Sequence, residues 1–513
     1  MRITEMHTEM QMKSQQRWDA IVIGSGMGGL TFASLYSQLA GKRVLLLERH
    51  YVPGGFTHSF ERKGFRWDVG LHYVGSMKSG TQPRQLMDLV TGGQLDWQAL
   101  PDGFDVHHFP SLQMTTFSDP NRSKASLCER FPQEVPAIDK YFRDVAATAK
   151  AMGVQIWSWS LPGWISTPLR WLAPRATKLS TTTVADYLAQ NFQNPQLRAL
   201  LTSHWGDYGL VPEHASFATH ALITASYFGG AYYPVGGAER IAECAVEVIR
   251  KHGGDCLTSA NVDRILVESG AAVGVVAGGC EFRAPIVVSN AGAAKTFELL
   301  SKALPDLTST RGTAVVTLYL GLKGSPLALG MKGENHWIHK SFEHRVGAEL
   351  SSAFVSFGSL NHPGIKKHTA QVMSVVDPSL FEPWNGTQWK KRGEDYEALK
   401  RSLSEQLIAL AEQAVPGLRD HIEYCELSTP LTTQHFTGSS AIYGSPGSVE
   451  RFRKRKPTVR TGVTNLLLAG ADACSLGIQG SLMGGVFAAG YALHPLSGFP
   501  RIIKAARAAA LAR

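Results

Sequence analysis

The chain has 513 residues, of which 44% are hydrophobic and 18% are charged. This length exceeds the size at which a single hydrophobic core stops growing, so we expect two domains. The hydrophobic content excludes a disordered protein. The net charge of +9 is a modest excess for such a length, and it is compatible with anionic lipid, a phosphate-bearing cofactor or nucleic acid.

Targeting and cysteine signals are weak. Residues 1–18 contain no apolar stretch of the signal-peptide type, and no window reaches the roughly 18 uninterrupted apolar residues needed to cross a bilayer. We therefore expect a cytoplasmic protein that lies on a membrane surface as a peripheral protein. The six cysteines are scattered and include no CxxC pair, which predicts reduced thiols, no disulfide framework and no metal site.

The first motif is a strand, glycine turn and helix near the N-terminus. The apolar run 19–23 predicts a buried strand, an apolar segment at 30–39 predicts a helix, and 42–47 predicts a second strand that ends at Glu48. The turn fits GxGxxG and consists of Gly24, Ser25, Gly26, Met27, Gly28 and Gly29. Its glycines permit a tight turn, close approach of backbone N–H groups to a pyrophosphate, and close helix packing.

Glu48 lies where a carboxylate accepts hydrogen bonds from the adenosine ribose, about 20 residues after the turn. A carboxylate there disfavours the 2′-phosphate of NADP. The motif alone does not separate NAD from FAD. The loop that follows Glu48 favours FAD, because a flavin ring extends beyond the pyrophosphate and needs chain close to it. The residues expected to serve it are Arg49, Gly54 and Gly55, although an ordinary Pro-Gly turn is the alternative.

The C-terminal region supplies a second half-site. Residues 464–469 predict a buried strand, which leads into a turn with Gly470 and Asp472, and a helix begins after the glycine-rich stretch 476–485. This arrangement brings an acid to a ribityl hydroxyl and a helix N-terminus, with Gly480 and Leu482, to the electron-rich edge of a flavin. The alternative is a second, unrelated turn.

A middle segment completes the predicted cofactor domain. Residues 238–251 predict a helix, short strands follow at 256–258, 262–268, 272–276 and 286–291, and Val262 offers its backbone to the adenine. We expect an α/β protein with a discontinuous Rossmann-like FAD-binding domain and a mixed-sheet and helical substrate domain. The predicted FAD domain comprises 17–75, 232–301 and 457–495, the substrate domain comprises 76–231 and 302–456, and 1–16 and 496–513 are terminal extensions.

These segments resemble the flavoprotein oxidoreductases that include phytoene desaturases, carotenoid isomerases and retinol saturases. The similarity is carried by residues 24–29, 48, 53–55, 67–75, 94–97, 131–134, 232–237, 287–292, 391–396, 429–432 and 469–485. The pieces at 72–73, 94–97 and 391–396 are narrower and point to the saturase branch. The resemblance implies that reduced FAD saturates one C=C bond of a hydrophobic polyene or unsaturated lipid.

The resemblance also places 67–75 beside the isoalloxazine ring. His72 or Tyr73 is then a candidate to donate a proton to carbon while the reduced flavin supplies hydride. The alternative, that both residues only shape the pocket, stays open.

Membrane contact is suggested by two segments. One is rich in aromatic residues interleaved with Pro and Arg, and its tryptophans are Trp157, Trp159, Trp164 and Trp171. These rings suit a membrane–water boundary or a hydrophobic tunnel, and core packing is the alternative. The other is the tail 499–513, which predicts a basic amphipathic helix on anionic lipid or a solvated terminal helix. The basic run 451–457 is interpreted as a solvated loop, with lipid headgroups or NADPH as alternatives, and nucleic acid is not expected as a partner.

Missing motifs narrow the chemistry. The sequence contains no GxSxG, HExxH or P-loop motif, and only one GxGxxG, so no separate NAD(P)H domain is expected. The flavin is then reduced by NAD(P)H at its own face or by an electron-donor protein. Two alternatives to the saturase remain: a carotenoid or fatty-acyl desaturase or a redox-neutral cis–trans isomerase that uses FADH₂, and a flavin-bearing, membrane-associated binding protein without turnover.

Overall fold

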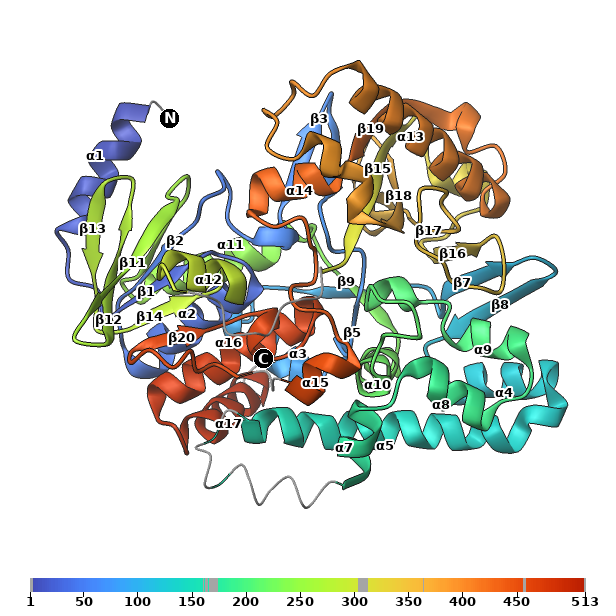
Figure 1. Cartoon of the computed structure of the whole chain (residues 1–513), viewed down its shortest axis with the longest axis horizontal. Coiled ribbons are helices and arrows are strands. Elements are labelled where there is room, and N and C mark those ends of the chain that lie inside the picture. Colours follow the sequence, from blue (N-terminus) through green and yellow to red (C-terminus); the bar gives the residue numbers. More distant parts are fainter. Residues whose placement is uncertain are drawn as a thin grey trace.

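The computed structural model describes residues 3–159, 161, 165, 174–302, 312–362, 364–454 and 458–511. Two large sheets organise them (Figure 1). A parallel sheet lies on one side of the molecule and a mostly antiparallel sheet on the other, with a group of helices below the second sheet in this view. Among the described residues, no helix is both long and apolar enough to cross a membrane.

The parallel sheet joins three distant pieces of chain. Its order is β10 (Asp255–Leu257), β2 (Val44–Leu47), β1 (Ala20–Ile23), β14 (Val287–Ser289) and β20 (Leu466–Leu468), with every neighbouring pair parallel. In chain order this is 3-2-1-4-5, which matches the first five strands of the Rossmann order 3-2-1-4-5-6. A ligand crevice is expected where the order reverses, between β1 and β14, at the carboxyl ends of the strands.

Both faces of this sheet are covered, which explains why its strands are apolar throughout. Ala20 and Val22 of β1 pack toward α2 (Met27–Ala40), α11 (Glu239–Lys251) and α16 (Gly477–Leu493). Ile21 and Ile23 pack on the opposite side, against the three-stranded sheet β11 (Val262–Glu268), β12 (Ala271–Ala277) and β13 (Cys280–Arg283). The helix α12 (Ala293–Leu299) follows β14 and also lies against β11.

Helices near both ends of the chain pack on the elements that surround the parallel sheet. The N-terminal helix α1 (Ile3–Ser14) buries Met10 in the same cluster as Trp18 and β13, and its Lys13 pairs with Asp255 at 2.5 Å. The C-terminal helix α17 (Gly498–Leu511) buries Ile502 and Ala506 against α16 and α3 (Gln82–Val90). The predicted tail helix therefore forms, and its apolar side is used for packing within the protein.

The seven-stranded sheet is built from both of the predicted inserts. Its order is β19 (Ile422–Ser428), β15 (Ala314–Leu322), β18 (Thr369–Val376), β17 (Ser352–Ser356), β16 (Asn335–His339), β7 (Gly103–Phe109) and β8 (Leu112–Phe117). Only the β16–β7 pair is parallel. Its β16–β18 part is contacted by α13 (Glu394–Ala414).

The helices of the second domain come mainly from the first insert. They are α4 (Pro120–Arg130), α5 (Val135–Trp159), α7 (Pro174–Ser180), α8 (Val184–Asn191), α9 (Pro195–Leu201) and α10 (Phe217–Ser226). Most of their buried apolar side chains form one cluster together with Phe109 and Leu112 of β7 and β8. In Figure 1 they lie at the lower right, beneath the edge of the seven-stranded sheet.

Short strands connect the two domains. The hairpin β3 (Ser59–Arg62) and β4 (Phe65–Asp68) leads into β5 (Val74–Gly75), which pairs with β9 (Ala231–Pro234), and β9 pairs with β6 (Trp97–Ala99). The Trp67 indole donates to the Leu320 carbonyl oxygen at 3.0 Å. The Asp68 carboxyl accepts from the Ser59 hydroxyl at 2.6 Å and from Tyr233, and burial raises its pKa to about 6. These contacts hold the loop 69–73 between the two domains.

Candidate active site

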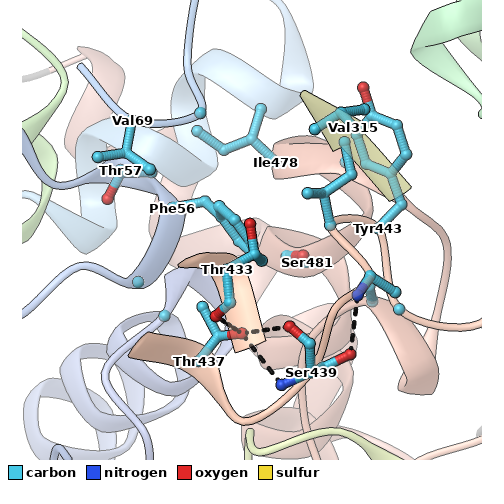
Figure 2. A pocket seen from close by; sticks show the side chains of 18 of the residues that line it. Phe56, Thr57, Val69, Val315, Thr433, Thr437, Ser439, Tyr443, Ile478 and Ser481 are labelled. Atoms are coloured by element: carbon cyan, nitrogen blue, oxygen red, sulfur yellow. Dashed lines mark hydrogen bonds between the residues drawn. The ribbon is translucent and has the colours of Figure 1, made fainter. Parts of the chain in front are cut away.

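A cavity of about 1070 Å³ is lined by residues of both domains. Pockets for drug-sized ligands usually enclose about 300–1000 Å³, so this cavity has room for a dinucleotide together with part of a substrate. Figure 2 shows side chains from distant parts of the chain that line one region of it: Phe56, Thr57, Val69, Val315, Thr433, Thr437, Ser439, Tyr443, Ile478 and Ser481.

The glycine turn after β1 is packed too tightly for side chains. A Cβ on Gly28 would lie 2.3 Å from the backbone nitrogen of Gly470, and one on Gly29 would lie 2.1 Å from the carbonyl oxygen of Gly24. The N-terminal end of α2 therefore approaches the turn after β20 backbone to backbone. Gly28 and Gly29 lie behind the cavity wall, whereas the turn residues that line the cavity are Gly24, Gly26 and Met27.

Ser25 holds the predicted ribose-binding acid in place. Oε2 of Glu48 accepts hydrogen bonds from the backbone N–H of Ser25 at 2.8 Å and from its hydroxyl at 2.7 Å. The backbone N–H of Gly54 donates to the same hydroxyl at 3.1 Å. Ser25 is fully buried and does not face the cavity. Glu48 does line the cavity, and a carboxylate has about four acceptor positions, so acceptor positions remain for ribose hydroxyls.

The other predicted residues of this end also line the cavity. Arg49 donates from Nη2 to the His435 carbonyl oxygen at 3.2 Å. Gly54 and Gly55 have φ values of 118° and 57°, and a Cβ on Gly55 would lie 3.0 Å from Cα of Gly26. Val262 begins β11 and borders the cavity close to Glu48, whose carbonyl oxygen accepts from the N–H of Ala260 at 2.8 Å.

Asp472 lines the cavity, but its oxygens already have partners. They accept from the backbone N–H groups of Ala293 and Ser445, each at 2.7 Å. Burial alone raises the pKa of Asp472, but the charge of Arg451 and these N–H donors outweigh burial and bring the pKa below its usual value. Asp472 therefore ties together the segment after β14, the end of the second insert and the turn after β20. Its predicted contact with a ribityl hydroxyl depends on the acceptor positions that remain.

The start of α16 also borders the cavity. Gly480 directly follows the N–H groups at 477–479 that have no partner within the helix, and a Cβ on Gly480 would lie 2.0 Å from the Ser475 carbonyl oxygen. Leu482 is fully buried, and neither it nor Gly470 lines the cavity. Gly470 serves the site indirectly, through its contact with Gly28.

The residues present fit a dinucleotide. The crevice between β1 and β14 opens into the cavity, and the N-terminus of α2 supplies N–H groups for a pyrophosphate. This end of the cavity is lined by glycines, which allow the backbone to approach a ligand closely. They are Gly24, Gly26, Gly54, Gly55, Gly292, Gly444 and Gly480. Among the described residues, no group of three or more His, Cys, Asp or Glu is arranged to hold a metal ion.

His72 lies in the cavity wall in neutral form. Its Nδ1 is 3.0 Å from the hydroxyl of Ser356, and its buried Nε2 has no hydrogen-bond partner among the described residues. Burial lowers its pKa to about 4, so the ring is uncharged at neutral pH. A neutral imidazole is a weaker proton donor than imidazolium, which favours a pocket-shaping or hydrogen-bonding role for His72.

Tyr73 also lines the cavity, and its hydroxyl meets two carboxyl groups. It lies 3.2 Å from Oδ2 of Asp105 and 3.4 Å from Oδ2 of Asp207. The ring is stacked between those of Tyr227 and Phe354, with centroids 4.9 Å and 5.9 Å away. Burial raises the pKa of Tyr73 well above its usual value. The roles proposed for His72 and Tyr73 stay predictions.

Three residues of the site were missed in the sequence. Asn290 follows β14, and its side chain fills the space beside Gly26, Gly28 and Gly470. The only available signal was its place after a buried strand. Asp105 and Asp207 lie about a hundred positions apart, on β7 and on a short 3₁₀ turn, and no local pattern joins them.

The segments predicted to contact a membrane are only partly described. Trp157 packs on Phe499 of α17, with ring centroids 5.8 Å apart. Trp164 and Trp171, like the side chain of Trp159, lie outside the described residues, and so do residues 455–457 of the basic run. Within that run, Arg451 donates to the carbonyl oxygens of Ser445 at 2.7 Å and Ala471 at 3.0 Å, so this arginine supports the turn that carries Asp472.

Comparison with known proteins agrees with this geometry. The family described as NAD(P)-binding Rossmann-like domain matches residues 22–90. An all-trans-retinol 13,14-reductase of Danio rerio is 34% identical over 91% of this chain and 84% of its own length, and the human protein of that name is 31% identical over the same shares. A prolycopene isomerase of an Oncidium hybrid cultivar is 28% identical over 90% of this chain and 81% of its own.

Solved structures show the same fold. An oxidoreductase from Methanosarcina mazei superposes with a TM-score of 0.62 at 18% identity, covering 91% of this chain and 98% of its own. Cyclohexylamine oxidase from Brevibacterium oxydans gives a TM-score of 0.61 at 18% identity, covering 97% and 100%. Together with the dinucleotide crevice and the identity to the reductases, these findings place the chain in the family of all-trans-retinol 13,14-reductases, as a flavin-dependent oxidoreductase.

Proposed function

We propose that the cofactor is FAD and that the chain reduces one C=C bond of a hydrophobic polyene or unsaturated lipid, as a saturase of the retinol type. The observation that carries this proposal is the cavity itself. One end is lined by the glycine turns and Glu48, and the same space continues between apolar side chains of the second domain. A dinucleotide and a long apolar substrate therefore share one continuous cavity.

The shape of the cofactor end supports FAD over NAD. Lining residues continue past the pyrophosphate crevice to Gly54, Gly55 and the first turn of α16. A flavin ring needs this additional length, and the positive end of a helix dipole suits its electron-rich edge. Glu48 disfavours a ribose 2′-phosphate, which argues against NADP as the resident dinucleotide.

The second-domain end suits a conjugated hydrocarbon. It is lined by Leu71, Ile156, Leu222, Ile223, Trp337, Phe354 and Met373. Each Å² of apolar lipid surface that is buried against these side chains contributes roughly 25 cal/mol to the free energy of binding. Tyr73, Asp207 and Tyr227 line the same region, so the wall combines apolar side chains with a small polar group.

Bound reduced FAD supplies hydride to one carbon of the double bond. The residues of the chain hold the cofactor, keep water away from the reacting bond and deliver a proton to the neighbouring carbon. Tyr73 and His72 are the candidates from the sequence, and the neutral state of His72 favours Tyr73 and the carboxyl groups around it.

We also propose an external electron donor, either NAD(P)H at the flavin face or a donor protein. The described residues contain one parallel dinucleotide sheet and no second. Anaerobic titration of the oxidised protein with NADH, NADPH and a reduced carrier protein tests this, with flavin bleaching as the readout. Bleaching by none of them at stoichiometric amounts would reject these donors.

Peripheral attachment to a membrane is the third part of the proposal. Arg501, Lys504 and Arg507 are exposed on one side of α17, beside a groove that includes Trp157 and Phe499. Cationic side chains next to partly buried aromatic rings suit an anionic lipid surface. Flotation with vesicles that contain anionic lipid should carry the protein upward, and flotation that is unchanged when all three residues are replaced by Gln would contradict this contact.

The principal test is product analysis with defined substrates. The protein reconstituted with FAD is given all-trans-retinol, a carotenoid or a polyunsaturated fatty acid under anaerobic conditions, in one sample with the flavin reduced by dithionite and in a second with the flavin oxidised. A mass gain of two hydrogens supports the saturase, whereas a loss of two or no change in mass with a new isomer supports a desaturase or an isomerase. The isomerase stays a specific alternative because of the similarity to prolycopene isomerase. Reduced flavin that no lipid reoxidises, with no new isomer formed, would favour a binding protein without turnover.

A further inference from the structure

A buried group of two carboxyls and one tyrosine lies at the second-domain end of the cavity. Asp105 on β7 and Asp207 on the 3₁₀ turn Trp205–Asp207 both contact the Tyr73 hydroxyl. We propose that Asp207 is the acid that protonates the substrate carbon, and that Tyr73 is a positioning residue that bridges Asp207 to Asp105. This inference rests on the proposed reduction of a C=C bond.

Counting protons in this group supports the assignment. A tyrosine hydroxyl has one proton and donates it fully to one acceptor only. Two ionised carboxylates at one hydroxyl would also repel each other. Both contacts become hydrogen bonds when one carboxyl is protonated and donates to the tyrosine oxygen, while the other is ionised and accepts the tyrosine proton.

The surroundings show which carboxyl holds the proton. Oδ1 of Asp105 accepts from the side-chain amide of Asn335 at 3.2 Å, and a donor of this kind stabilises the ionised form. Among the described residues, the side chain of Asp207 has one hydrogen-bond partner, the hydroxyl of Tyr73. Asp105 is therefore the acceptor and Asp207 the protonated member.

The electrostatic environment agrees with this assignment. The titratable groups that face Asp207 are Asp105 and four tyrosines: Tyr73, Tyr208, Tyr227 and Tyr443. None of them carries a positive charge. Desolvation, followed by the charge of Asp105, raises the pKa of Asp207 well above its usual value, whereas desolvation raises that of Asp105 to about 7.

The positions of the two carboxyls relative to the cavity also favour Asp207 as the proton donor. Asp207 lines the cavity, together with its neighbours Trp205 and Gly206, and Asp105 does not. Asp105 is 4% exposed and lies behind Tyr73. An apolar substrate that fills this end displaces water from Asp207, which further favours its neutral, proton-carrying form.

The proton balance is complete. One carbon of the double bond receives hydride, which the reduced flavin supplies, and the O–H bond of Asp207 breaks as a C–H bond forms at the neighbouring carbon. Asp207 is left as a carboxylate next to ionised Asp105. The repulsion between the two charges drives uptake of a proton from water once product has left the cavity.

The test compares three variants in the flavin-loaded protein. Asp207→Asn keeps the shape but removes the acid, and we expect turnover to fall by about 100-fold or more while FAD affinity stays unchanged. In the assigned arrangement the Tyr73 oxygen accepts the proton of Asp207 and so stabilises its neutral form. Tyr73→Phe removes this acceptor, so it should retain more turnover and move the alkaline limb of the rate profile to lower pH. Asp102→Asn, an exposed aspartate three positions before Asp105, is the matched control and should behave as wild type.

An infrared measurement gives a readout that does not depend on turnover. With a non-reacting polyene bound, at a pH of about 9 and so well above the pKa of about 7 of Asp105, the wild type should show the carbonyl stretch of a protonated carboxyl, which shifts in D₂O. The band should persist in Tyr73→Phe and Asp102→Asn and disappear in Asp207→Asn. A band that remains in Asp207→Asn overturns the proposal, and so does turnover of Asp207→Asn within about threefold of wild type.

The remaining outcomes also decide the question. If Tyr73→Phe abolishes turnover and Asp207→Asn is mild, Tyr73 is the proton donor and the proposal is wrong. If Asp207→Asn does not retain FAD, the proposal is tested by the alkaline limb of the rate profile of Tyr73→Phe and by the infrared carbonyl band of the wild type. If the wild type reduces no polyene, the proposed function fails, while the band still reports whether Asp207 is protonated.

Discussion

The two ends of the cavity are built in different ways. The cofactor end is mainly backbone, namely glycine turns, helix N-termini and a buried serine that joins them, with a few charged side chains such as Glu48 and Asp472. At its glycines an added Cβ would lie near 2 Å from other backbone atoms. The substrate end is made of side chains, with stacked aromatic rings, buried histidines and a carboxyl pair. A backbone site is rigid and tolerates no added atoms, whereas a side-chain site has titratable groups and depends on pH. The predictions below test this difference.

The largest effect is expected for an added methyl group at the cofactor end. In Gly28→Ala, the new Cβ meets the backbone nitrogen and Cα of Gly470 at 2.3 and 2.4 Å, and neither atom is the end of a flexible side chain. Overpacking of this kind costs about 3 kcal/mol or more, so FAD affinity should fall by about 100-fold. Equilibrium binding of FAD to the apoprotein measures it. Gly324→Ala, where no atom lies within 4 Å of the new Cβ, should bind as wild type, and equal affinity in the two variants would show that close packing is not what the site requires.

The second prediction concerns the substrate end and acid. Burial lowers the pKa of His204, His336 and His344 to about 4 and that of His107 to about 3. Their unfolded-state pKa is about 6.5, so below that pH the unfolded chain binds more protons and stability falls until pH 4. Each such histidine costs about 2 kcal/mol at pH 5. Asp105 and Asp207 act in the opposite direction, because their raised pKa values favour the folded state as pH falls, but the four histidines outnumber them.

Chemical denaturation at several pH values measures this dependence. The unfolding free energy of the wild type should fall steeply between pH 6.5 and 4. In His204→Gln the pH slope should be smaller by about one proton in that window, while His7→Gln, which changes an exposed residue on α1, should leave it unchanged. A slope that His204→Gln does not alter would mean that this histidine is not held neutral by burial.

The difference between a backbone site and a side-chain site also explains how much of each end the sequence could predict. The cofactor end depends on local order along the chain: strand, glycine turn, helix and terminal acid. For this reason β1, α2 and β2 lie close to their predicted positions, and most of the predicted cofactor residues line the cavity. Ser25 and Asp472 were assigned direct contacts, whereas the structure gives Ser25 a buried structural role and gives both oxygens of Asp472 backbone partners.

The substrate end depends on contacts that no local pattern records. Tyr73, Asp105 and Asp207 come from three separate segments, and they meet because β7 pairs with β16 and the 3₁₀ turn after α9 packs beside it. In the sequence, Asp105 is one polar residue in an alternating strand and Asp207 is one residue of a Gly-Asp turn. Neither type of position is distinctive, so the sequence pointed to the tyrosine without its partners.

The third prediction addresses the junction between the two ends. Asp472→Asn replaces one carboxylate oxygen with an amino group that faces a backbone N–H, either of Ala293 or of Ser445. Loss of a charge-assisted hydrogen bond costs about 1.5–3 kcal/mol, so FAD affinity should fall about 10- to 100-fold. Calorimetric titration with FAD measures this loss, and Asp186→Asn on the exposed side of α8 is the control. Unchanged affinity in Asp472→Asn would indicate that the three joined segments hold their positions without it.

The smallest effect is expected for Ser25→Ala, which tests whether the cofactor end depends on a hidden side chain. The change removes one of the donors to Oε2 of Glu48 and leaves the Gly54 N–H without its acceptor, while the backbone donor of Ser25 remains. An unsatisfied buried group costs about 1–2 kcal/mol, so FAD should bind roughly tenfold more weakly. Because Ser25 does not face the cavity, the weakening should appear as a faster dissociation rate with an unchanged flavin spectrum. Ser341→Ala, in an exposed loop, is the matched control. If Ser25→Ala instead alters the spectrum and leaves the affinity unchanged, Ser25 contacts the cofactor directly and the cofactor end is not purely a backbone site.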